Sequence, residues 1–176
     1  MWAVERLKWA AATTAVLYAV FVAAAHVPLS REEARRMSEE LSSIATSINS
    51  PLMIFANNAA IALLMVVPLL GAAAGLYVIY NTGLYLSALA ITSGAPPTLL
   101  AVVPLLAIYG VLEFFGYGIC FSEGLRLLRA ITRRKLRPEI RPTSLMVAMG
   151  LLVLFVAALL EFLIIQSLQT FSTWFS

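Results

Sequence analysis

Long apolar stretches dominate this chain, and they constrain its fold more than any other feature. About five of them are long enough and apolar enough for an α-helix to cross a bilayer. Across the whole chain 61% of the residues are hydrophobic, 12% are charged, and the mean hydropathy is +0.92. Because a soluble domain carries about 25% charged residues, a soluble fold is excluded. The sequence predicts an all-α, polytopic membrane helix bundle.

The predicted bundle is a single membrane domain over residues 1–176, with two polar segments outside its spans. An amphipathic helix is expected over 30–49, and a basic segment over 123–141. The transmembrane spans are expected at about 9–25, 52–70, 72–93, 97–120 and 143–168. Glycines at the two ends of the run 71–75 have GxxxG spacing, which leaves open whether this run links two spans or continues a helix.

The segment 30–49 has the pattern of an amphipathic helix outside the lipid. Ser30 and Glu33 have the spacing of a capping box, and Ser50 followed by Pro51 marks the start of the next helix. Apolar residues recur among the charged ones at steps of three and four: Ala34, Met37, Leu41, Ile44 and Ile48. The simplest interpretation is a solvated connector that packs its apolar stripe on the membrane domain. The alternative is a docking surface for another protein or for the membrane interface.

Positively charged residues are distributed unequally along the chain, and this distribution predicts its orientation. With a cytoplasmic N-terminus and five crossings, nine of the twelve Lys and Arg residues lie inside, and the other three lie outside in 31–36. This arrangement agrees with the positive-inside rule. We therefore expect a multi-pass plasma-membrane protein with a cytoplasmic N-terminus, an external amphipathic helix and an external C-terminus.

The basic segment 123–141 is predicted to set this topology and to contact anionic lipid headgroups. Nucleic-acid binding is not expected, because no aromatic residues alternate with the cations. The candidate headgroup contacts are Arg126, Arg129, Arg133, Arg134, Lys135 and Arg137.

Five polar residues lie inside the apolar stretches and form the candidate functional or structural cluster: Asn57, Asn58, Asn81, Glu113 and Glu161. A carboxyl group there costs roughly 2.5–3.5 kcal/mol to insert, so it is expected to face a partner or a water-filled cavity. Asparagines in spans are more often hydrogen-bonding links between helices than ligands for a substrate. For Glu113 the choice lies between a neutral carboxyl group that donates a hydrogen bond and a carboxylate that handles protons or cations.

The adjacent residues Asn57 and Asn58 point in two directions, because neighbouring residues on an α-helix are about 100° apart. One amide is therefore expected to face the bundle interior, and the other a second helix or the outer surface. We predict that at least one of them bonds a polar or backbone group on another span, with Asn81, Glu113 and Glu161 as the candidates.

The remaining composition argues against an enzyme. The chain has a single cysteine, Cys120, and a single histidine, His26. An intrachain disulfide and a metal cage of cysteines or histidines are therefore excluded. The sequence also lacks the HExxH motif and a Ser-His pair that would indicate hydrolytic chemistry. We expect no catalytic residues, no cofactor and no metal ligands.

Three short motifs resemble the stage II sporulation protein M (SpoIIM) family of bacteria and archaea. They are the run 55–60 with its paired asparagines, the run 80–83 with an asparagine before a glycine, and the run 109–114 with a glycine three positions before a glutamate. The resemblance covers roughly residues 50–130. Tyr109 stands where the family usually has histidine, which weakens any proposal of a His–Glu proton or metal site. The resemblance implies a membrane scaffold for cell-wall hydrolases, which is the role of the family member in sporulating bacteria.

Two functions follow as hypotheses from these patterns. The first is a non-enzymatic membrane scaffold or complex subunit that engages other membrane or surface proteins, or a second copy of itself. The alternative is a small transporter or channel subunit that uses Glu113 and the asparagines along a polar pathway. The two differ in whether the polar residues line a continuous water-accessible path or bond to one another.

Overall fold

The computed structural model describes residues 2–174, and it describes their side chains except at 2, 45 and 168–174. This part of the chain is all-α, as predicted. Its seven helices are α1 (Trp2–Ala25), α2 (Arg31–Ser47), α3 (Pro51–Val66), α4 (Leu70–Ser93), α5 (Pro97–Leu106), α6 (Ile108–Thr132) and α7 (Leu136–Trp174).

Three of these helices are long and apolar enough to cross a membrane. They contain the candidate spans Ala3–Ala25, Leu70–Ser93 and Leu136–Ser167. The pair α5 and α6 adds a fourth if it is counted as one broken span, whereas the apolar helix α3 is shorter. The chain therefore has the architecture of a multi-pass membrane protein with three or four candidate spans of full length, where the sequence predicted about five.

The predicted span 97–120 is not one straight helix. α5 and α6 meet at an angle of 85°, and Ala107 between them has an extended backbone with ψ 118°. Pro104 lies inside α5, where it cannot donate a helical hydrogen bond and clashes with the preceding turn. A Cβ atom at Gly110 would lie 2.4 Å from the Pro104 carbonyl oxygen, so the bend also depends on glycine at this position.

Helices α3 and α4 form a tight hairpin, which resolves the ambiguity over 71–75 in favour of a helix. α3 ends before Pro68, and α4 begins at Leu70 directly after a residue with φ 68°. Gly71 and Gly75 are both buried in α4, and a Cβ atom at Gly71 would lie 2.4 Å from the Met65 carbonyl oxygen of α3. The GxxxG spacing therefore marks a close contact between these two helices.

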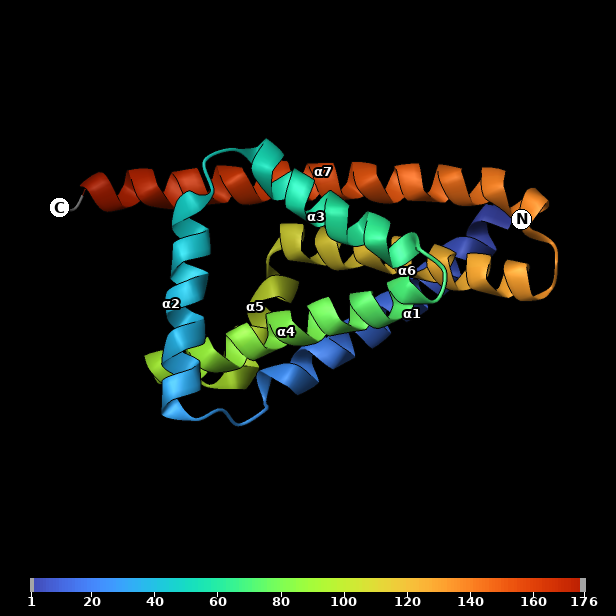
Figure 1. Ribbon diagram of the computed structural model, residues 1–176. Coiled ribbons are helices and arrows are strands. Elements are labelled where there is room, and N and C mark those ends of the chain that lie inside the picture. The colour runs from blue at the N-terminus through green and yellow to red at the C-terminus, as the bar shows by residue number, and fades with distance from the viewer. Residues whose placement is uncertain (1, 175–176) are drawn as a thin grey trace.

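Helix α6 is central to the packing, since it contacts α1, α3, α4, α5 and α7. The core around it includes the rings of Phe21 and Phe114, whose centroids are 5.3 Å apart. Figure 1 shows the N-terminus and the turn between α6 and α7 at one end of the bundle. Helix α2 lies across the opposite end, where it packs on α4. The basic segment and the amphipathic helix are thus at opposite ends of the bundle.

Candidate functional site

Two of the predicted polar residues bond across helices in the middle of the bundle. Asn58 is buried in α3, and its Nδ2 atom donates a hydrogen bond of 2.5 Å to Oε1 of Glu113 in α6. The carboxyl group of Glu113 lies beside that of Glu161 in α7. These three residues, which we call the Asn58 cluster, connect α3, α6 and α7.

The other two predicted members lie elsewhere. Asn57 is exposed, and its amide only approaches that of Asn58, with 3.5 Å between Nδ2 and Oδ1. Asn81 donates from Nδ2 to the Tyr77 carbonyl oxygen of its own helix, at 2.8 Å. The predicted cluster of five residues is therefore a cluster of three. The asparagine pair divides into an inward and an outward residue as expected, and the predicted bond to another span is made by Asn58 with Glu113.

Replacing Asn58 with leucine is expected to lower the free energy of unfolding by about 1–2 kcal/mol, near the upper end for side-chain hydrogen bonds in membranes. The partly buried Glu113 carboxyl group would lose a hydrogen-bond donor, which costs more than the loss of the bond alone. Asn57→Leu is the matched control and should be nearly silent, because Asn57 is exposed on the same helix. Unfolding titrations in mixed micelles measure both values, and equal effects would contradict the assigned directions.

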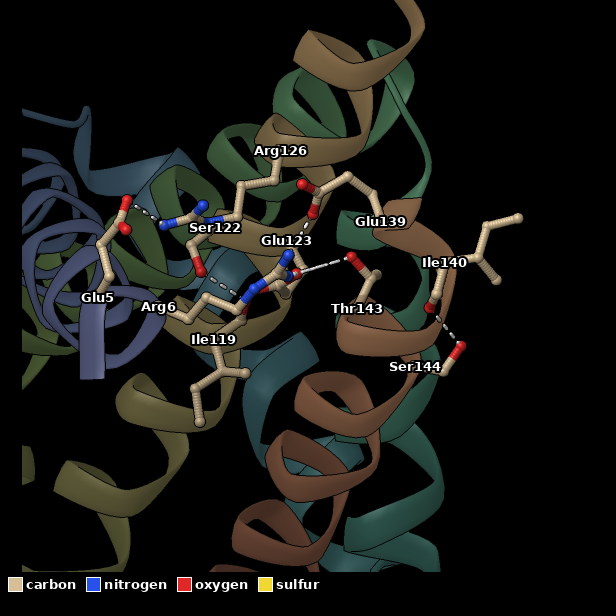
Figure 2. A network of polar contacts seen from close by, with 10 residues as sticks. All are labelled: Glu5, Arg6, Ile119, Ser122, Glu123, Arg126, Glu139, Ile140, Thr143 and Ser144. Carbon is tan, nitrogen blue, oxygen red and sulfur yellow. Dashed lines mark hydrogen bonds and ion pairs between the residues drawn. The ribbon is translucent and has the colours of Figure 1, made fainter. Parts of the chain in front are cut away.

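A second buried polar cluster was not predicted from the sequence (Figure 2). Nη1 of Arg6 in α1 pairs with Oε2 of Glu123 in α6, and Nη2 pairs with Oε2 of Glu139 in α7. The hydroxyl group of Thr143 donates to the same Glu123 oxygen at 2.8 Å. Arg6, Glu123, Glu139 and Thr143 form what we call the Arg6 cluster. It connects the start of α1 to α6 and α7.

Burial distinguishes the Arg6 cluster from a surface ion pair. Glu123 is 0% exposed, and Arg6 and Thr143 are each 5% exposed. The sequence contains a signal for the burial of Glu123. Glu123 follows Cys120 and Ile119 by three and four positions, so it shares the face of α6 on which these two residues are buried. In the sequence, Glu123 lies within the basic segment and Arg6 among the cations near the N-terminus, so neither residue stands out as part of the core.

The six candidate headgroup contacts divide into two groups. Arg126, Arg129, Arg133 and Lys135 line a cavity of about 440 Å³ next to Trp9. Arg134 and Arg137 are exposed and do not line it. Among the described residues no three His, Cys, Asp or Glu side chains gather in a way that would hold a metal ion.

No protein-family model matches the chain, and neither a curated protein nor a solved structure matches it.

Proposed function

We propose that this chain is a non-enzymatic membrane scaffold or complex subunit, in line with its resemblance to the stage II sporulation protein M family. The observation that carries this proposal is the way in which its intramembrane polar groups bond to one another. Asn58, Glu113 and Glu161 connect three helices. Side chains that are bonded in this way hold helices together, whereas a solute pathway needs polar groups that are available to the solute.

Helix α2 supports the scaffold proposal because it offers a charged face away from the bundle. It packs on α4 through the buried Ala34 and through the Ser38 hydroxyl group, 3.0 Å from that of Thr92. Its exposed side carries two ion pairs, Arg35 with Glu39 and Arg36 with Glu32. This surface of mixed charge suits a hydrated protein partner better than lipid.

The start of α2 is fixed by its capping box. The Ser30 hydroxyl group donates to Oε2 of Glu33 at 2.6 Å, and the Glu33 amide donates back to that hydroxyl oxygen at 3.2 Å. The hydrogen bonds from the hydroxyl and then the amide of Ser30 lower the pKa of Glu33. The cap therefore keeps its charge at the helix N-terminus, where the helix dipole favours it.

In the proposed orientation α2 is external, and the N-terminus with the basic segment is cytoplasmic. The unequal distribution of cations supports this orientation, and the basic segment and α2 lie at opposite ends of the bundle (Figure 1). The partners would then be surface or membrane proteins that reach the external face, or a second copy of the chain.

Photo-crosslinking in intact cells tests the scaffold proposal. A crosslinking residue at Arg31, which is exposed on α2, is expected to capture the same partner reproducibly. The matched control carries the crosslinker at Leu152, which is 62% exposed on the apolar helix α7 and is expected to face lipid. No partner from several exposed positions of α2, or the same proteins from Leu152, would contradict a docking role for α2.

The alternative is a proton-coupled transporter subunit, and one observation favours it. Glu113 and Glu161 place two carboxyl groups side by side between two spans, and acidic residues inside membranes occur in proton relays. Proteoliposomes with an imposed pH gradient test this function. Proton flux in the wild type that is lost in Glu113→Gln, but kept in Glu39→Gln on the exposed side of α2, would establish transport. The scaffold proposal predicts flux no greater than that of empty liposomes.

A further inference from the structure

The cavity at the basic end of the bundle has a strongly cationic wall. Arg126, Arg129 and Arg133 contribute three guanidinium groups, and Lys135 contributes an ammonium group. The three arginines are spaced by three and four positions, so they lie on one face of α6. Lys135 belongs to the turn that leads into α7, which brings it to the same cavity of about 440 Å³.

The negative charge near this cavity is insufficient to balance these cations. The one carboxylate in its wall, Glu139, is already paired with Arg6. Oε1 of Glu5 forms an ion pair with Nη2 of Arg126 at 3.6 Å, a distance that is too long for a hydrogen bond (Figure 2). Within the described part of the chain, the buried Nε and Nη2 atoms of Arg126 have no hydrogen-bond partner. A buried donor without an acceptor is costly, so these atoms favour an anionic ligand in the cavity.

The cavity also has an apolar wall. Trp9 is 51% exposed, and the guanidinium carbon of Arg126 lies 5.9 Å from the centroid of its ring. Leu125 lines the cavity beside it. Trp9 is in the first half of the candidate span Ala3–Ala25, near the depth at which tryptophan side chains favour the membrane–water interface. A ligand with a charged group and an apolar part satisfies both walls.

We propose that this cavity binds the phosphate group of an anionic phospholipid. Guanidinium groups form charge-assisted hydrogen bonds with phosphate oxygens. In this site Arg126 supplies the buried donors, and Arg129, Arg133 and Lys135 surround the remaining oxygens. The glycerol and the start of the acyl chains lie against Trp9 and Leu125. Basic pockets between spans on the cytoplasmic side recognise headgroups in the same way.

This site differs from the diffuse attraction of a basic segment to an anionic membrane. Diffuse attraction depends on the number of cations, whereas the site depends on which cations line the cavity. The chain offers a direct comparison, because Arg129 and Arg133 line the cavity, whereas Arg134 and Arg137 do not. All four side chains are exposed, so neither pair is needed for core packing. The proposal is independent of whether the protein is a scaffold or a transporter.

Native mass spectrometry of the full-length protein in detergent tests the site. The protein is titrated with phosphatidylglycerol, with phosphatidylcholine as the reference lipid and inorganic phosphate as the soluble competitor. The wild type is expected to bind phosphatidylglycerol roughly tenfold or more tightly than phosphatidylcholine, given the attraction contributed by each nearby cation. R129Q/R133Q should lose most of this preference, and R134Q/R137Q, which removes the same charge, should keep it.

Three results would overturn the proposal. An equal loss in both double variants would show diffuse attraction, and an unchanged affinity in R129Q/R133Q would show that the lipid binds elsewhere. Displacement by millimolar inorganic phosphate, without preference between the two lipids, would identify free phosphate as the ligand. If R129Q/R133Q does not fold, as judged by gel filtration and thermal unfolding, the single variants R129Q and K135Q are compared with R134Q.

Discussion

Replacing Glu123 with leucine is expected to destabilise the protein by about 3 kcal/mol, the lower end of the usual cost of breaking a buried ion pair. The Arg6 guanidinium group would lose its fully buried partner Glu123 and would keep its ion pair with the partly exposed Glu139. Arg6→Met should cost a similar amount, since it leaves the fully buried Glu123 without its cation. Unfolding titrations in mixed micelles would measure both losses.

The double variant Arg6→Met/Glu123→Leu separates ion pairing from general disruption. Because it removes both charges at once, it should be much less damaging than the sum of the two single changes. Glu39→Leu is the control on the exposed side of α2. It removes a carboxylate whose ion pair with Arg35 is solvent-exposed, and such pairs contribute 0 to about 1 kcal/mol. Additive losses in the double variant would rule out a coupled buried pair.

Replacing Gly83 with alanine is expected to lower the free energy of unfolding by about 3 kcal/mol, the upper end of the usual cost of overpacking. A Cβ atom at this position of α4 would lie 2.4 Å from the Phe21 carbonyl oxygen and 2.5 Å from Cβ of Ala24 in α1. The first of these atoms belongs to the backbone, so α1 and α4 would have to move apart. A rotamer change cannot relieve the clash.

Thr82→Ala is the matched control for Gly83→Ala. It places the same side chain on the neighbouring position of the same helix, where Thr82 is exposed. Its effect should be within about 0.5 kcal/mol, as for most surface substitutions. If the two variants unfold at the same denaturant concentration, then α1 and α4 do not pack as closely at Gly83 as the structure indicates.

The helical class of this protein and several of its local features were determined by its sequence. Apolar stretches of membrane-spanning length satisfy their backbone polar groups in lipid by forming helices. The sequence also predicted the helix caps, because capping involves residues only three positions apart. Ser30 and Glu33 form the predicted capping box, and Ser50 caps α3, accepting from the Met53 amide at 3.3 Å. The opposite directions of Asn57 and Asn58 follow from helix geometry alone.

The tertiary structure decided which polar residues meet. Arg6 and Glu123 are 117 positions apart, and no periodicity connects them, because their contact depends on how α1 packs on α6. Likewise, Asn58 bonds to Glu113 while Asn81 bonds to its own helix, although all three have the same polar signature in an apolar stretch. The bend at Ala107 also depends on tertiary packing, since many spans accommodate a proline without breaking. Periodicity places a side chain on a face of its helix, and only the packing of the helices decides what that face meets.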